Sequence, residues 1–159
     1  MKITHLSIDQ FGLRSDLQLE QLSSQLNLVY GPNGTGKSTA IQFLRWVLYG
    51  RRDATTERYL SVRRATCTGA LAGSVGQYDF TIRRQDDGTP GGSLSITGNL
   101  PKEIGRQDTQ ELLGGIGPDQ FDRMCVLSFD HPLDIHGLID DALGRGLDLV
   151  CRSEADPRE

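Results

Sequence analysis

Apolar and polar residues alternate near the start of the chain in the period-two pattern of half-buried strands. Leu6 and Ile8 place one such strand in residues 1–10, and residues 16–20 read Asp-Leu-Gln-Leu-Glu, which alternates strictly. Phe11-Gly12 supplies a turn between them. The pattern therefore predicts an N-terminal hairpin.

The same alternation returns farther along the chain. Residues 78–83 alternate, a turn-rich segment rich in glycine and aspartate follows, and residues 94–96 alternate again. With residues 69–75 as a further strand, this pattern predicts an antiparallel subdomain over about residues 69–97.

Other stretches follow different periods. Residues 26–30 (Leu-Asn-Leu-Val-Tyr) predict a short buried strand that ends in a loop, and residues 38–49 carry apolar side chains at helical spacing before Gly50. A glycine at this point is typical of a helix C-terminus. The stretch 51–66 is polar and lacks clear periodicity, so a loop, mobile or facing a ligand, is the interpretation there.

The last third of the chain predicts shorter pieces. Residues 109–113 and 119–123 favour short helices on either side of a glycine-rich linker. Residues 124–129 predict an apolar strand that ends in Asp-His-Pro, and a final amphipathic helix begins after Asp134, a good N-cap residue.

A glycine-rich motif separates the predicted strand 26–30 from the predicted helix. It fits GxxxxGK[ST] and is extended by one threonine, in the order Gly31, Pro32, Asn33, Gly34, Thr35, Gly36, Lys37, Ser38 and Thr39. Strand, loop and helix in this order are the context in which the motif binds phosphate. We therefore predict an ATP site at residues 31–39.

Each residue type in the motif suits a triphosphate. Glycines allow the backbone to curl with positive φ, so that successive amides point at the anion and the helix N-terminus adds its dipole. Lys37 adds a positive charge at the β and γ phosphates, and the Ser38 hydroxyl is a hard oxygen ligand for Mg²⁺.

Length and composition limit the other functions. A chain of 159 residues predicts one domain, and no apolar run approaches the ~20 residues that span a bilayer. The start of the chain lacks a secretory signal, so the expected location is cytoplasmic, with no membrane partner. Three scattered cysteines indicate neither a disulfide framework nor a zinc cluster, and the net charge of −4 gives no general field for nucleic acid.

With these residues in hand, the sequence resembles the N-terminal half of an ABC-type ATPase head of the SMC, RecF and RecN superfamily, most closely the YhaN-type AAA ATPases. The matching features are the Phe11-Gly12 turn, the Tyr30-Gly31-Pro32-Asn33 approach to the loop, and Leu48-Tyr49-Gly50 at the helix end. The resemblance implies an α/β fold of the P-loop NTPase type: a mixed β-sheet, one P-loop helix and an antiparallel β subdomain.

The resemblance also implies roles for three further residues. Asp130 or His131 stands where most such heads carry the Q-loop glutamine that touches Mg²⁺ and the attacking water, which makes Lys37, Asp130 and His131 the candidate catalytic residues. Arg14 is similar to a basic residue that related heads aim at the nucleotide, and the alternative is a solvated arginine at a strand edge.

Several parts of a complete head are missing from the sequence. No Ser-Gly-Gly signature, no apolar strand ending in Asp-Glu and no later switch histidine is found. The expectation is therefore that residues 1–159 are the N-terminal lobe of a head, which binds ATP and Mg²⁺ but needs a C-terminal lobe or a second head for hydrolysis. DNA repair or processing beside a nuclease subunit is what the resemblance implies for the assembly.

Two other readings stay open from the sequence. The first is a self-contained small P-loop kinase or NTPase in which residues 124–129 form the acid-bearing strand and Asp130 supports Mg²⁺. The second is an interaction module that binds no nucleotide.

Overall fold

A computed structural model describes residues 1–50, 54–61, 66–89, 91–101 and 109–126 of the chain. By their internal contacts the residues divide into two units, 1–116 and 117–159, and each is described here by itself. Among the described residues, no helix has both the length and the hydropathy required to cross a membrane.

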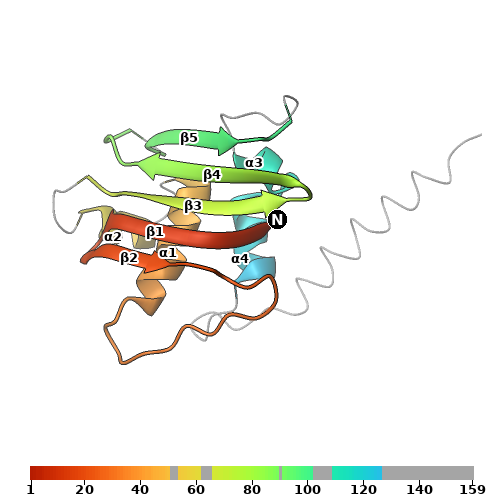
Figure 1. The fold of residues 1–159 in the computed structure, drawn as a ribbon. Coiled ribbons are helices and arrows are strands. Elements are labelled where there is room, and N and C mark those ends of the chain that lie inside the picture. Colours follow the sequence, from red (N-terminus) through yellow and green to blue (C-terminus); the bar gives the residue numbers. More distant parts are fainter. Residues whose placement is uncertain (51–53, 62–65, 90, 102–108, 127–159) are drawn as a thin grey trace, which may run out of the picture. The chain divides into compact units, whose positions relative to one another are not determined.

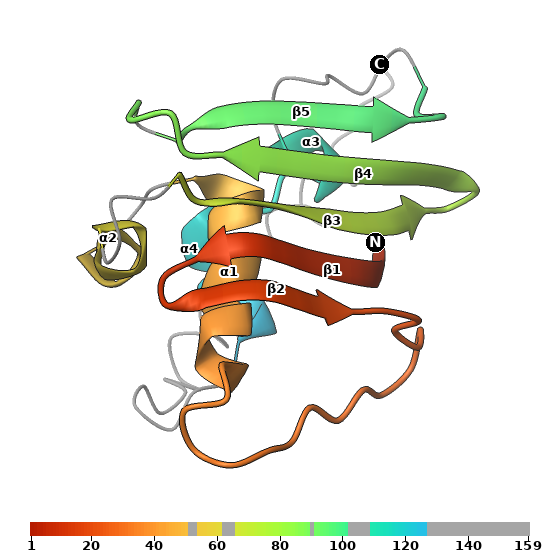
Figure 2. The same ribbon diagram turned by 60° about the vertical axis from the view of Figure 1, so that its left-hand side comes forward.

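The first unit is built on a five-stranded sheet (Figure 1). The strand order is β2-β1-β3-β4-β5, and every pairing between these strands is antiparallel. The strands are β1 (Lys2–Phe11), β2 (Arg14–Leu19), β3 (Thr68–Val75), β4 (Tyr78–Gln85) and β5 (Ser93–Gly98). The N-terminal hairpin and the predicted subdomain thus form one continuous sheet, with β1 directly beside β3 (Figure 2).

Alternation along the strands divides the sheet into two different faces. The inner face carries the buried apolar side chains, and they belong to several strands: Leu6, Ile8, Leu71, Phe80, Ile82 and Ile96. The pairing aligns them, because Leu6 lies opposite Leu71 and Leu71 opposite Ile82. Burial on one face fixes the register, since a shift by one residue would turn this set outward.

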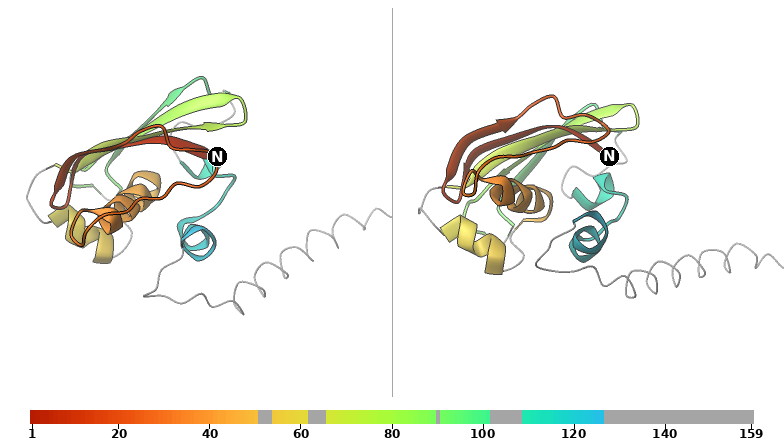
Figure 3. Two further views of the ribbon diagram at one scale, coloured as in Figure 1. Left: turned by 60° about the horizontal axis from the view of Figure 1, so that its bottom comes forward. Right: turned by 90° about the horizontal axis from the view of Figure 1, so that it is seen from below.

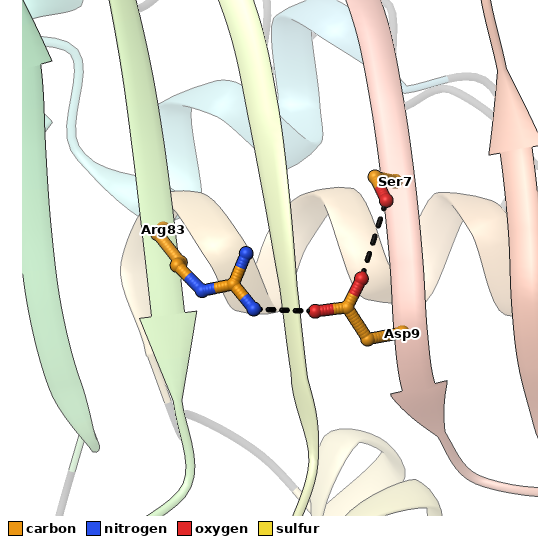
Figure 4. A network of polar contacts seen from close by, with 3 residues as sticks. All are labelled: Ser7, Asp9 and Arg83. Carbon is orange, nitrogen blue, oxygen red and sulfur yellow. Dashed lines mark hydrogen bonds and ion pairs between the residues drawn. The ribbon is translucent and has the colours of Figure 1, made fainter.

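The outer face carries polar side chains and small ones. On it, Arg83 of β4 reaches over β3 and donates from Nη2 to Oδ2 of Asp9 on β1, at 2.6 Å (Figure 4). Ser7 donates to the other carboxylate oxygen of Asp9. The residue between the two strands is Ala70, which pairs with both Ser7 and Arg83. Its small side chain leaves room for the guanidinium to cross.

Helix α1 (Lys37–Tyr49) packs on the inner face, on the same side of the sheet as α2 (Figure 3). Its buried side chains include Phe43, Trp46 and Val47, all of which are fully inaccessible. The helix ends at Gly50, which has φ +77° and donates its amide to the carbonyl of Trp46 at 2.8 Å. The predicted helix and its glycine stop are both confirmed.

Three shorter helices complete the described part. Helix α2 (Ala54–Ser61) lies within residues 51–66, so the loop predicted for this stretch is wrong at residues 54–61. Helix α3 (Thr109–Leu112) belongs to the first unit, and α4 (Pro118–Cys125) to the second. The two short helical pieces predicted from the sequence are therefore present, and the α/β fold class of the P-loop type is confirmed. The prediction of a mixed sheet is wrong for the described strands, because each of them pairs antiparallel with its neighbours.

Two predicted strands differ from the structure. Residues 26–30 form no strand, and their side chains are exposed, with Leu26, Leu28 and Tyr30 above 80% accessible. No described strand lies beside this segment, so its backbone lacks a ladder and its apolar side chains lack a layer to pack on. The strand predicted at 124–129 is wrong at its start, because Met124 and Cys125 end helix α4, and residues 127–129 lie outside the described part.

Candidate functional site

The glycine-rich loop, residues 31–38, is held in a curl by its own hydrogen bonds. Thr35 donates to the carbonyl of Pro32 from its hydroxyl at 2.9 Å and from its amide at 3.4 Å. The Nζ atom of Lys37 donates to the carbonyls of Gly31 at 2.7 Å and Pro32 at 2.9 Å. The loop therefore closes around the ammonium group of Lys37.

Positive backbone angles at two glycines shape the end of the loop. Gly34 has φ +80° and Gly36 has φ +103°, a region that residues with a side chain rarely adopt. Gly36 is also the N-cap of α1, and its carbonyl accepts the helix's first hydrogen bond, from Ala40, at 2.9 Å. Glycine at position 36 is thus required by the backbone itself.

The amides at the start of α1 are available to a ligand. Within the described part of the chain, the N–H groups of residues 36–39 have no hydrogen-bond partner, and the N-cap provides no side chain to take one. The first turn also carries no acidic residue. Unpaired amides at a helix N-terminus, together with the positive end of the helix dipole, form a site for an anion.

Lys37 adds a positive charge to this candidate anion site. An ammonium group has three donors, and the carbonyls of Gly31 and Pro32 take two of them. The third donor remains for a ligand, while the other two fix where the charge sits. The side chain is part-buried, so its charge is held close to the loop.

A cavity of about 670 Å³ opens beside these groups, within the range that holds a small-molecule ligand. Its walls come from the glycine-rich loop and helix α1, from the β1–β2 turn and from α2: Gly12, Leu13, Arg14, Asn33, Gly34, Gly36, Lys37, Ser38, Thr39, Arg58 and Tyr59. Gly31, Pro32 and Thr35 do not line it, and they hold the loop's shape. Most of the residues predicted for the nucleotide site therefore share one cavity.

Arg14 and Arg58 add positive charge to this cavity. Arg14 begins β2 and lies against the loop, since a Cβ added at Gly36 would be 3.0 Å from its Nε atom. Arg14 thus lines the cavity and also stands on an edge strand, and its role toward a nucleotide stays a prediction. Arg58 comes from α2. With Lys37, three basic side chains surround the cavity.

Few described side chains near Ser38 could coordinate the metal ion predicted there. Ser38 is the second residue of α1, is exposed, and lines the cavity with Thr39. Among the described residues there is no group of three or more His, Cys, Asp or Glu side chains able to hold a metal ion. A hydroxyl beside a triphosphate suits Mg²⁺, which keeps several waters and takes few protein ligands. Asp130 and His131 lie outside the described residues.

The sequence did not single out Arg58 and Tyr59, because helix α2 was not predicted. Thr56 and Leu60 are both buried and stand four residues apart, which is helical spacing. One apolar and one polar residue give too weak a signal by themselves. Tyr59 lies between them and its ring stacks on Phe11 of β1.

Comparisons with known proteins add to this geometry. A protein-family model described as an AAA domain matches residues 1–133. A search of curated proteins finds no significant match. Seven chains of solved structures match, and one comes from work on the structural biochemistry of ATP-driven dimerization and DNA-stimulated activation of SMC ATPases. It is 21% identical with a TM-score of 0.60, and the match covers 89% of this chain and 99% of that chain. At this identity the likeness concerns the fold.

Proposed function

This chain belongs to the AAA-domain family, and from that premise we propose that it is the ATP- and Mg²⁺-binding N-terminal lobe of an SMC-like ATPase of the YhaN type. The glycine-rich motif, the likeness in fold to a solved SMC ATPase chain, and the cavity at the loop support this proposal. Under it, residues 31–39 hold the nucleotide.

One observation carries the proposal. Residues 36–39, which carry the unpaired amides and the ammonium group of Lys37, all line the same cavity. Backbone amides bind a phosphate chain without losing side-chain entropy, and a fixed ammonium group adds a charge-assisted hydrogen bond. Arg14 and Arg58 add positive charge to the same cavity. This combination of donors and positive charge suits a polyphosphate.

Ser38 is the residue that would hold Mg²⁺ beside the phosphates. When bound, the ion neutralises charge on the β and γ oxygens. The Ser38 hydroxyl makes no hydrogen bond to another residue in the described part of the chain, so it is available as a ligand. Asp130 and His131 are proposed to act near the ion and the attacking water.

The exposed segment 26–30 supports the need for a second lobe. Its apolar side chains are accessible, although this segment leads directly into the nucleotide loop. A neighbouring apolar cavity of about 490 Å³ is lined by Val29 together with β1, β2 and α1. Under the proposal, a C-terminal lobe covers this surface and supplies the missing acidic base.

ATP hydrolysis and the cellular role are proposed for this chain together with its partners. The solved relative is described through ATP-driven dimerization and DNA-stimulated activation. We accordingly propose that this chain acts with a C-terminal lobe or a second head, in DNA repair or processing beside a nuclease, in the cytoplasm. This chain alone is expected to bind ATP without turning it over.

Equilibrium binding of ATP with and without Mg²⁺ tests the proposal. Lys37→Ala should weaken ATP binding about 10- to 100-fold, because it removes a charge-assisted hydrogen bond worth about 1.5–3 kcal/mol. Lys2→Ala is the matched control, since Lys2 is an exposed lysine that does not line the loop cavity. Circular dichroism should show that both variants keep the fold.

The outcomes separate the alternatives. Equal ATP binding by wild type and Lys37→Ala would contradict the proposal and favour an interaction module. Phosphoryl transfer by this chain alone, abolished by Asp130→Ala, would favour a self-contained kinase or NTPase. ATPase activity that appears only when the C-terminal lobe is added would support the proposed lobe.

A further inference from the structure

Two of the residues that line the loop cavity have large apolar or aromatic side chains, and they come from the β1–β2 turn and from α2. Tyr59 is the one aromatic residue among the described residues that line the cavity. Leu13 lines it as well, and its side chain is 68% exposed. An exposed leucine and a half-exposed tyrosine in a cavity of otherwise polar character offer contact area to an apolar or aromatic group of a ligand.

Packing from behind holds the Tyr59 ring in place. It stacks on Phe11 with the ring planes 8° apart and the centroids 5.3 Å apart. Phe11 is fully buried and contacts Phe43 and Trp46 of α1, each at a centroid distance of 5.4 Å. The ring of Tyr59 thus belongs to an aromatic cluster that continues into the core, and Tyr59 is half-exposed and lines the cavity.

Gly12 sets how closely Tyr59 approaches the turn. A Cβ at this position would be 2.9 Å from Cδ1 of Tyr59, and the residue has φ +60°. Glycine therefore brings the β1–β2 turn, with Leu13, against the aromatic ring. The turn and α2 form one continuous wall of the cavity.

We propose that Tyr59, together with Leu13, is the base-stacking wall of the site and gives it a preference for purine nucleotides. This inference rests on the proposed function, because it assumes that the phosphates lie at the glycine-rich loop. A pre-positioned ring adds stacking energy at low entropic cost. Purines present a larger aromatic face than pyrimidines, and stacking alone does not distinguish adenine from guanine.

Binding of inorganic triphosphate, ATP, GTP and UTP to this chain tests the inference. Inorganic triphosphate reports the phosphate site without a base. Wild type should bind ATP and GTP about 10-fold more tightly than inorganic triphosphate, and UTP should lie between them. Tyr59→Leu should reduce the ATP advantage to less than about 3-fold and leave triphosphate binding unchanged.

Two variants serve as controls. Tyr59→Phe keeps the aromatic face and should retain the ATP advantage. Tyr78→Leu changes a half-buried tyrosine of β4 that does not line the cavity, and should also retain it. This pattern across the variants would support the inference.

Three results would overturn it. The first is an unchanged ratio of ATP to triphosphate affinity in Tyr59→Leu. The second is an equal loss of ATP and triphosphate binding, which would assign Tyr59 a purely structural role. The third is a wild type that binds neither triphosphate nor ATP, and this result alone would also remove the proposed function.

Discussion

Arg84 donates a hydrogen bond of 2.9 Å from Nε to the main-chain carbonyl of Val47, which joins strand β4 to the last turn of helix α1. The same guanidinium donates to the carbonyl of Leu48 at 3.5 Å and to that of Gly91 in the β4–β5 connection. Arg84 is only 6% exposed. A buried cation thus stabilises the negative end of the helix whose positive end faces the candidate anion site.

Replacing Arg84 should therefore destabilise the fold. Arg84→Met keeps a long apolar stem but leaves the carbonyls of Val47 and Leu48 without this donor. A buried polar group that loses its partner costs about 1–3 kcal/mol, so we expect the free energy of unfolding to fall by about 3 kcal/mol. Urea denaturation followed by circular dichroism measures the change.

Arg83 is the matched control, because it is the adjacent arginine on the opposite face of the same strand. Its side chain is 56% exposed and pairs with Asp9 on the outer face (Figure 4). Exposed ion pairs contribute little, so Arg83→Met should cost less than about 1 kcal/mol. Equal effects of the two substitutions would contradict a special role for Arg84.

Gly69 is expected to be intolerant of any side chain. A Cβ at this position would lie 2.3 Å from Cζ of Phe43 and 2.4 Å from the carbonyl oxygen of Ser7. Gly69→Ala must therefore push α1 away from the sheet or displace β1. Overpacking of this kind typically costs 1–3 kcal/mol, and we expect a loss of about 2 kcal/mol in the free energy of unfolding.

Ala72→Ser provides the comparison for Gly69→Ala. It also adds one heavy atom to β3, but at a half-exposed position on the outer face. Surface changes of this kind stay within about 0.5 kcal/mol. If thermal unfolding placed both variants at the wild-type midpoint, the close contact between α1 and β3 would be wrong.

Asp87 should show an unusual titration. Hydrogen bonds from Ser93 at 2.5 Å and from the Thr89 hydroxyl at 2.6 Å stabilise its carboxylate and lower its pKa from 3.8 to about 2. A lowered pKa means that the carboxylate stabilises the β4–β5 connection above about pH 4, and that this contribution is lost as the pH falls through about 2.

Carboxyl chemical shifts followed by NMR over acid pH measure the Asp87 titration directly. Ser93→Ala should raise the pKa of Asp87 towards its ordinary value, because Ser93 is the largest cause of the shift. Ser95→Ala, two residues farther along β5, should leave it near 2. An Asp87 that titrates at its ordinary value in the wild type would show that the Ser93 and Thr89 bonds do not form in solution.

Local patterns predicted most of the described fold. Alternation located the strands of the sheet, and helical spacing with Gly50 located α1. Burial on one face requires apolar residues at the period of the strand or helix, so it is visible in the sequence. The segment 26–30 was misjudged for a physical reason: its apolar run requires neighbouring strands, and none lies beside it in the described part. An apolar run in a sequence predicts that the segment is buried, but it does not identify the surface that covers it.

The candidate site was partly predictable from the sequence. The glycine-rich motif led directly to the curled loop, since its residues are close in sequence. Arg58 and Tyr59 belong to helix α2, and Tyr59 packs on Phe11, a contact between residues far apart in the chain. Such contacts depend on the whole fold. The roles predicted for Asp130 and His131 stay predictions.

The accessible leucine and tyrosine side chains of residues 26–30 have a practical consequence for handling the isolated chain. An exposed apolar segment of this kind favours self-association. Concentrated samples should form aggregates through it, and dilution or a mild detergent should reverse the earliest stage. Light scattering would then rise with protein concentration far below the unfolding temperature. Co-expression with the proposed C-terminal lobe, which would cover residues 26–30, should suppress this aggregation and help crystallisation.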